Sequence, residues 1–533
     1  MSYLVPSTSS FQPTGRSSQG EIRSELQRQR YAFFSCAIHL VSKHGSNSPH
    51  IASIHILNDD SLLYLFYLYR PPIFDGDESG DDRILGGRRW DREQWWYKLA
   101  HVCRRWRKLI LGSASYLGIC LVCTYGTPVA DMLAHSPPFP LIIDYLGDHR
   151  DIRAEEEGII LALGERDRVC RIRLQMPVPK MQKIIMSIDE EYPVLEYLIM
   201  WPSTGDDSVT LVFSESFQAP HLRHLMLFSF SLPIGSRFIM TAVGIVTLGI
   251  FMRQPSTYFQ PNTLVEWISF MPQLDTLLIS FLSPVPNRYV GRQLTHTPHM
   301  TQVTLPNLRS FGFRGVSAYL EAVVRRITAP RLEKLAVQFF KQLTFSVPRL
   351  VQFMNTTENL RFDSSEVVFS GNEVYAKLYR EGDEAYVLSV SVFCWHLDWQ
   401  VSFVAQFFDS RGQIFPAVEK LALYHEVHNR SSEEHNHVDR AEWRKLLRSF
   451  NNVKNLRVED GLVEKLSRSL LLDNGELPPG LLPELQELTY SGDDNIGDAF
   501  TPFVDARLKA GLPVNLVGPS SNSVTLPRST GLV

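Results

Sequence analysis

Cysteine is scarce in this chain, with six residues among 533. A small secreted domain held by disulfides has a far higher cysteine density, so that class is excluded. Charge of either sign is not in excess, because 53 lysine and arginine residues balance 57 aspartate and glutamate residues. Nucleic-acid-binding proteins usually show a strong basic excess, and we therefore expect no nucleic-acid partner.

Long apolar runs are also missing. The longest uncharged one covers residues 238–252, which is shorter than the roughly 18 to 20 residues that span a bilayer. We expect it to form a buried helix and strand. The first 20 residues have neither the basic start nor the apolar centre of a signal peptide. The sequence thus predicts a cytoplasmic or nuclear protein with no membrane partner.

Composition and periodicity divide the chain into successive parts. The predicted parts are a disordered N-terminus (1–20), a helix (21–45), a small all-α module (50–117) with an acidic, glycine-rich loop (75–87), a repeat solenoid (118–516) and a disordered tail (517–533). Inside the module we expect one helix over 55–70, capped by Asn58 or Asp59, and a second over 91–113.

A short phrase recurs from about residue 190 onward. It consists of a proline, any residue, Leu or Val, two residues, Leu, one residue and an apolar residue. It occurs at 192–200, 219–227, 271–279, 305–313, 329–337, 415–423 and 482–490, and without the proline at 450–458. Fixed phrases every 20 to 35 residues are typical of a solenoid.

The phrase has a direct physical basis. In Leu332-x-x-Leu335-x-Val337 the last two side chains point to one face of a short strand, and Leu332 packs under the entering turn. One unit cannot bury these residues alone, whereas stacked units form a continuous parallel sheet. Helical patterns precede several phrases, at 262–271, 317–327 and 440–450. The predicted fold class is therefore α/β, a leucine-rich-repeat solenoid shaped as a horseshoe, with a parallel sheet and outer helices.

Two intervals between phrases are unusually long. Pro220 and Pro272 lie 52 residues apart, and Pro330 and Pro416 lie 86 apart (416 − 330). We expect the first interval to contain about two repeats and the second about three, some of them degenerate.

The module resembles an F-box. The opening pattern of that family corresponds here to Leu57-Asn-Asp-Asp-Ser-Leu62-Leu63-Tyr-Leu65-Phe66, and its second helix to Val102-Cys103-Arg104-Arg105-Trp106-Arg107. The chain as a whole is similar to the F-box and leucine-rich-repeat proteins that are multiplied in mushroom-forming fungi. Asn58 stands where the family usually has proline, and the loop at 75–87 lengthens the module.

The resemblance implies a non-catalytic substrate-recognition adaptor of an SCF-type cullin-RING ubiquitin ligase. The F-box would dock on the Skp linker protein, which joins it to the cullin, and the repeats would bind a protein substrate. For docking the resemblance points to Leu57, Leu62, Leu63, Phe66, Leu99, Val102, Cys103 and Trp106. For substrate binding, exposed positions beside the framework leucines are candidates: Arg331, Glu333, Lys334 and Gln338.

Two alternatives remain open. The chain could be an interaction scaffold whose altered F-box only caps the first repeat, in which case the docking residues form a private core. It could also be an enzyme without a recognised motif. No nucleophile elbow, P-loop or dinucleotide fingerprint is present, so we assign no catalytic residue and no cofactor.

Four short motifs look at first like metal or nucleic-acid sites, and for each we favour a simpler structural role. The stretch 75–82 resembles a calcium loop but has Gly86 at the position of the bidentate glutamate, so we expect a solvated acidic loop. The histidine-rich stretch from His425 to His437 lacks zinc-site spacing, and we expect an exposed loop. Cys120 and Cys123 lie in an apolar run and should be structural, and the basic run at 104–108 should form the solvated face of a helix. No metal site is therefore predicted.

Overall fold

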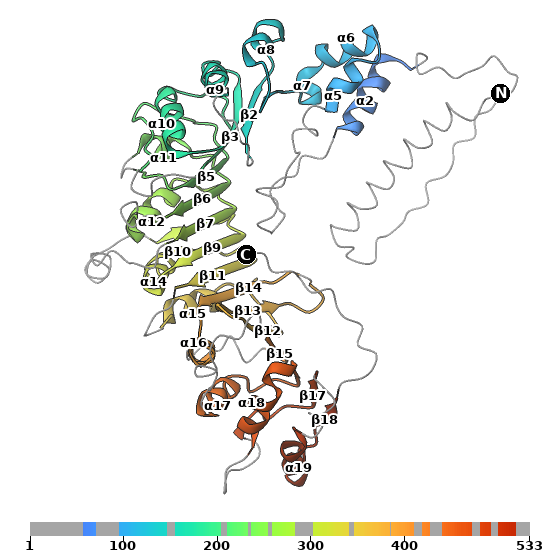
Figure 1. Cartoon of the computed structure of the whole chain (residues 1–533), viewed down its shortest axis with the longest axis vertical. Helices are drawn as coiled ribbons and strands as arrows, with labels where there is room; N and C mark the ends of the chain where they lie inside the picture. Colours follow the sequence, from blue (N-terminus) through green and yellow to red (C-terminus); the bar gives the residue numbers. More distant parts are fainter. Residues whose placement is uncertain are drawn as a thin grey trace, which may run out of the picture. The chain divides into compact units, whose positions relative to one another are not determined.

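The structure of the chain is a computed structural model (Figure 1). It describes residues 57–70, 95–146, 155–203, 210–232, 236–253, 258–282, 302–340, 346–383, 385–409, 418–426, 440–471, 480–491 and 499–518. The predicted disordered N-terminus (1–20), the helix at 21–45 and the loop at 75–87 lie outside the described residues, as does the predicted tail from residue 519 onward.

The chain divides into two compact units, residues 1–121 and 122–533, and each is described by itself. The described part of the first unit is helical, as predicted for the module. Its helices are α2 (Asp59–Tyr69), α5 (Trp95–Ala100), α6 (Arg104–Gly112) and α7 (Ala114–Leu117).

The start of α2 follows the prediction, because Asn58 caps it. The Asn58 backbone is extended, and its side-chain oxygen accepts a hydrogen bond from the Ser61 amide at 2.8 Å. This contact satisfies one of the amides that a helix N-terminus leaves without an intrahelical partner.

The prediction of one helix over 91–113 is wrong. The chain leaves helical geometry after Ala100, and Cys103 adopts an extended backbone as the N-cap of α6. Its sulfur accepts a hydrogen bond from the Trp106 amide at 3.5 Å. Arg107 Nε donates to the Ala100 carbonyl at 3.0 Å, which satisfies the C-terminal end of α5. Apolar spacing continues across the break, so periodicity alone could not reveal it.

The second unit is built on a sheet whose 16 described strands run in the order β1-β2-β3-β4-β5-β6-β7-β9-β11-β14-β13-β12-β15-β16-β17-β18. Their bounds are β1 Leu121–Cys123, β2 Leu141–Tyr145, β3 Val169–Met176, β4 Tyr197–Pro202, β5 His224–Phe228, β6 Thr247–Met252, β7 Thr276–Phe281, β9 Ser310–Gly315, β11 Lys334–Phe339, β12 Ser364–Phe369, β13 Glu373–Tyr379, β14 Leu388–Phe393, β15 Lys420–His425, β16 Asn455–Val458, β17 Glu487–Tyr490 and β18 Asn515–Val517. The boundary between the units falls inside β1. Two short strands, β8 (Val303–Thr304) and β10 (Ile327–Thr328), form a separate pair.

Helices alternate with these strands. They are α8 Val129–His135, α9 Glu156–Leu163, α10 Val178–Ser187, α11 Arg237–Thr241, α12 Pro261–Ser269, α14 Ser317–Val324, α15 Pro348–Asn355, α16 Leu397–Asp409, α17 Arg440–Arg448, α18 Asp460–Leu470 and α19 Thr501–Lys509. From α8 to α16 they lie along one side of the stacked strands (Figure 1). Among the described helices, none is long and apolar enough to cross a membrane.

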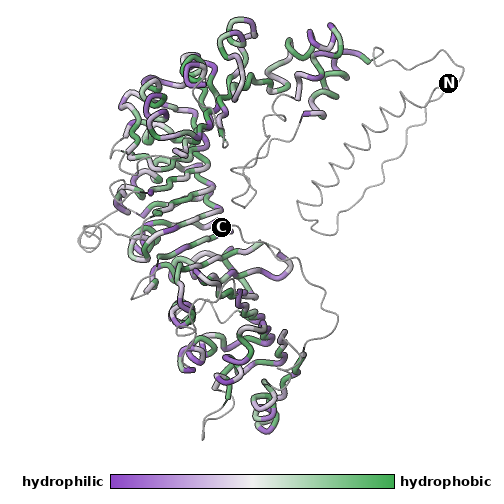
Figure 2. Tube along the Cα trace, viewed as in Figure 1, coloured by the Kyte–Doolittle hydropathy of each residue, from purple (hydrophilic) through white to green (hydrophobic). Residues whose placement is uncertain are grey.

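The recurring phrase is confirmed as the strand signal. All eight phrases end in a strand, namely β4, β5, β7, β9, β11, β15, β16 and β17. In the phrase that ends in β11, Leu332, Leu335 and Val337 are all buried. Hydrophobic residues dominate the strands from β5 to β11, whereas the outer helices are mixed (Figure 2). The predicted fold class, an α/β leucine-rich-repeat solenoid, is thereby confirmed.

The two long intervals have different outcomes. The 52-residue interval hides one further parallel strand, β6, which fits two repeats and places the run 238–252 in α11 and β6 as predicted. The 86-residue interval does hold three strands, but they are not three ordinary repeats. β11 pairs in parallel with β14, β14 antiparallel with β13, β13 antiparallel with β12, and β12 in parallel with β15.

A hairpin produces this reversal. After β12 the chain turns at residues 370–372, where the Ser370 amide donates to the Glu373 carbonyl at 2.9 Å, and returns as β13. β14 then fills the place beside β11, and α16 carries the chain to β15. A two-strand hairpin needs no helix, so the interval holds fewer helices than a repeat count predicts.

Candidate functional site

The helical module buries a core of its own. Leu62 and Phe66 on α2 and Trp106 on α6 are buried. The Phe66 and Trp106 rings meet edge to face with centroids 4.9 Å apart, a favoured aromatic geometry. These three side chains therefore hold α2 and α6 together.

Arg105 adds a polar contact between the same helices. Its guanidinium donates to the Leu57 carbonyl at 2.6 Å and to the Asp59 carboxylate at 2.7 Å. Both acceptors lie at the N-terminus of α2, so the contact fixes the start of α2 against α6. The rest of the basic run is solvated as predicted: Arg104, Arg107 and Lys108 are exposed.

The predicted docking residues occupy three environments. Those in the core of the module are Leu62, Phe66 and Trp106. Those that are half-buried are Leu57, Leu63, Leu99 and Cys103. Val102 lies between α5 and α6 and is 59% exposed. Val102 is thus exposed and Leu63 partly so, whereas Leu62, Phe66 and Trp106 pack inside the module.

Sequence reasoning missed a group of exposed tyrosines on the same unit. They are Tyr64, Tyr67, Tyr69, Tyr97 and Tyr116. Tyrosine combines apolar area with a polar tip and is enriched at protein interfaces. The signal was present in the sequence, because several of these residues interleave with the buried positions of α2.

The second unit presents what we call the strand face, the side chains of the sheet that point away from the buried framework leucines. On β11 the buried residues are Leu335, Val337 and Phe339, so Lys334 and Gln338 point to the strand face. Both are half-buried. Arg331 and Glu333 lie in the turn before β11 and are exposed.

The four predicted substrate residues already make contacts within the chain. Arg331 donates to the Asn307 side chain at 3.4 Å, and the Lys334 ammonium lies 4.3 Å from the centroid of the Tyr386 ring. Gln338 donates to the Glu373 carboxylate at 3.4 Å. The Glu333 amide donates to the Arg309 carbonyl, a contact that stacks neighbouring turns. The structure brings Lys334 and Gln338 to one strand, while Arg331 and Glu333 lie on the rim before it.

A stack of aromatic rings on the strand face also escaped sequence reasoning. We call Trp201 on β4, Phe228 on β5 and Phe251 on β6 the aromatic ladder. Ring centroids are 4.3 Å apart between the first two and 4.1 Å between the last two, and the planes are within 11° and 6° of parallel. Each is the fifth residue of its strand. Only the register of the strands reveals that they are neighbours, because the sequence separates them by more than 20 residues.

Further along, the strand face becomes polar and rich in tyrosine. Burial raises the pKa of Tyr375 and Tyr379 well above the ordinary value, and nearby glutamates act in the same direction. Tyr379 donates a hydrogen bond to the Glu366 carboxylate at 3.0 Å, and the Lys377 ammonium lies 4.8 Å from the Tyr375 ring centroid. These phenols are thus protonated donors at neutral pH.

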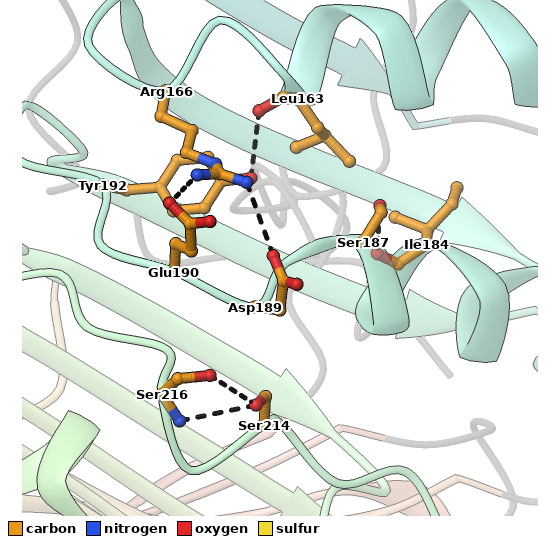
Figure 3. A network of polar contacts seen from close by, with 9 residues as sticks. All are labelled: Leu163, Arg166, Ile184, Ser187, Asp189, Glu190, Tyr192, Ser214 and Ser216. Carbon is orange, nitrogen blue, oxygen red and sulfur yellow. Dashed lines mark hydrogen bonds and ion pairs between the residues drawn. The ribbon is translucent and has the colours of Figure 1, made fainter.

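A polar network joins neighbouring repeats at the edge where strands begin (Figure 3). Arg166, in the turn before β3, forms ion pairs with Asp189 and Glu190 in the loop before β4. In the same place the Tyr192 hydroxyl donates to the Leu163 carbonyl at 3.0 Å. Nothing in this arrangement resembles a nucleophile with a base, and the network serves to stack the repeats.

The remaining motifs lie only partly within the described residues. Cys123 is buried in β1, and burial raises the pKa of its thiol to about 12, which disfavours the thiolate that binds metals. His425 ends β15, while His428, His435 and His437 lie outside the described residues. The stretch 75–82 lies outside them as well. Within the described ranges, no three His, Cys, Asp or Glu side chains gather as metal ligands.

Comparison with known proteins finds a similar solved structure but no match in sequence. No family model matches the sequence, and no curated protein matches it either. Among solved structures, the chain is similar to the leucine-rich repeat-containing protein LegL7 from Legionella pneumophila. The two are 10% identical, the match covers 72% of this chain and 98% of the other, and the TM-score is 0.24.

Proposed function

We propose that this chain is a non-catalytic adaptor that holds a protein substrate on its solenoid and a Skp linker protein on its helical module. The observation that supports it best is the strand face, where an aromatic ladder and a band of tyrosines remain half-buried beside a core already completed by leucines. Side chains of this kind dominate the energetics of protein interfaces. The resemblance of the module to an F-box supplies the second partner.

Such an adaptor performs no chemistry. Binding a substrate close to a ubiquitin-charged conjugating enzyme raises the local concentration of the substrate lysine, and the rate rises with it. Burial keeps the Tyr375 and Tyr379 phenols protonated at neutral pH, as suits hydrogen-bond donors of a binding surface.

Docking is tested by capture of purified Skp linker and cullin on the full chain. We expect Val102→Asp and Leu63→Asp to reduce capture about tenfold, because each places a charge at a predicted docking residue that is not fully buried in the module. Leu161→Asp, at an exposed leucine of α9 in the other unit, is the matched control and should leave capture intact. Trp106→Ala removes a core contact of the module and marks the result expected when the module unfolds. Full capture by the Val102 and Leu63 variants would disprove the docking assignment.

A second candidate is an interaction scaffold without a ligase. Two observations favour it. Asn58, the N-cap of α2, stands where the F-box family usually has proline, and Leu62, Phe66 and Trp106 are buried in the module itself. Under this alternative, neither Skp linker nor cullin binds the wild-type chain, while partners of the strand face still do.

A further inference from the structure

The strand face carries a graded surface, apolar at β4 to β6 and cationic at β9. Next to the aromatic ladder, Ile199 on β4 and Met226 on β5 point to the same face. Gly249 follows on β6, and a Cβ there would lie 3.0 Å from the Phe251 ring and 3.1 Å from Met226. The Phe251 ring therefore lies over the backbone of Gly249, which has no side chain. The ladder and these neighbours form one apolar platform.

Arg314 lies in the same row of the sheet as the ladder. The register places it beside Ser280 on β7 and Gln338 on β11. Its guanidinium carbon is 4.9 Å from the Phe393 ring centroid and 5.9 Å from that of Phe340. Aromatic faces hold the guanidinium in place but accept none of its N–H groups in a strong hydrogen bond.

The charge of Arg314 is only partly compensated. Across the residues that the structure describes, no side chain or carbonyl accepts a hydrogen bond from it, and its Nε is buried without an acceptor. Glu373 is the acid that acts on it, yet this carboxylate takes its hydrogen bond from Gln338. A half-buried guanidinium held on aromatic rings with unused donors is suited to a carboxylate, which it can bind through two parallel hydrogen bonds.

The spacing of the two features selects a conformation for the ligand. From Phe251 on β6 to Arg314 on β9 the sheet advances by two strands, or about 9.5 Å. A polyproline II helix places residues i and i+3 on the same side, about 9 Å apart. A fully extended strand would direct those two side chains to opposite sides.

We propose that the strand face binds a peptide in polyproline II conformation, with an aromatic side chain on the ladder and an Asp or Glu three residues away on Arg314. The proposal rests on the proposed function, since it names the class of segment that the solenoid recognises in a protein partner. Prolines between the two anchors favour it, because they preorganise the conformation.

Fluorescence anisotropy with the full-length chain tests this proposal. The probe is a labelled synthetic peptide, acetyl-Pro-Phe-Pro-Pro-Glu-Pro-amide, compared with versions in which Phe becomes Ala, Glu becomes Gln, or one central Pro is deleted. We expect each change to weaken binding about tenfold. In the protein, Arg314→Gln should abolish the preference for the Glu peptide over the Gln peptide. Arg314→Lys should restore only part of it, because an ammonium lacks the planar fork.

Two further variants test the same proposal without changing Arg314, in case the Arg314 variants fold poorly. Glu373→Gln removes the competing carboxylate and should tighten binding of the Glu peptide several-fold, without affecting the Gln peptide. Phe228→Ala should weaken binding of the Phe peptide more than binding of the Ala peptide. Absence of binding, equal affinity for Glu and Gln peptides, or indifference to spacing would overturn the inference. A chain that captures Skp linker and cullin but ignores these peptides refutes only this inference, whereas peptide binding without capture refutes only the adaptor.

Discussion

A buried ion pair on β2 and β3 should be decisive for the stability of the first repeats. Asp144 and Arg173 are register partners, and Arg173 donates to the Asp144 carboxylate at 3.0 Å. Their exposed fractions are 8% and 6%. The Arg173 Nε is buried with no acceptor, so no hydrogen bond at this atom would compensate for the loss of Asp144.

Removing Asp144 takes away the acceptor of the buried Arg173 charge, and removing Arg173 leaves the Asp144 carboxylate with a 3.4 Å hydrogen bond from the Leu146 amide. We expect Asp144→Leu or Arg173→Met alone to destabilise this region by about 3–5 kcal/mol. The double variant should lie within about 1 kcal/mol of the wild type, because an apolar pair of similar size needs no partner. The two changes are therefore strongly non-additive.

Hydrogen exchange of the β2 and β3 amides is the suitable measurement, because a solenoid need not unfold in one step. Each single variant should lose about a hundredfold or more in protection, and the double variant should recover most of it. Lys183→Met is the control. Lys183 pairs with Glu156 at a similar 2.8 Å but is mostly exposed, so its loss should cost less than about 1 kcal/mol. Equal effects of the exposed and the buried substitutions, or additivity in the double variant, would refute the reasoning.

Three other predictions concern separate parts of the chain. Asn58→Ala removes the cap that Ser61 uses and should destabilise the module by about 1 kcal/mol in thermal unfolding, with Asn58→Asp retaining stability. Arg507 is buried and donates to four backbone carbonyls in the turn before β17. Arg507→Met should therefore lower the free energy of unfolding of the last repeat by roughly 3 kcal/mol, measured as faster hydrogen exchange of the β17 and β18 amides. Burial, with a smaller effect of Lys465, lowers the pKa of His425 from 6.5 to about 4. The unfolded chain thus takes up this proton first, and stability falls as the pH drops from about 6.5 toward 4; His425→Asn should make that loss shallower in urea titrations.

The repeat phrase shows how far local sequence can reach. In Leu332-x-x-Leu335-x-Val337 all three apolar side chains are buried. The alternation of Leu335 and Val337 is the period of a strand with one buried face, and it therefore predicts the strand. The helix cap at Asn58 is equally local, since donor and acceptor are three residues apart. Both of these local features were predicted correctly.

The two wrong predictions have different causes. The break before α6 depends on Arg107 reaching back to Ala100, and apolar spacing does not register it. The order of strands β12 to β14 depends on pairing with β11 and β15, which lie far away in the sequence. The short turn at 370–372 gave no sign that it takes the place of a helix.

The sequence by itself determined the class of fold, because leucines at fixed intervals cannot be buried except by stacking. It also determined where the eight strands that end a repeat phrase lie, and where several helices lie. Tertiary structure alone decided the neighbours on the strand face. Trp201, Phe228 and Phe251 become one ladder, and Arg314 comes to rest on Phe393, through strand register between residues far apart along the chain. Such pairing depends on contacts between different repeats, so the sequence of a single repeat does not specify it.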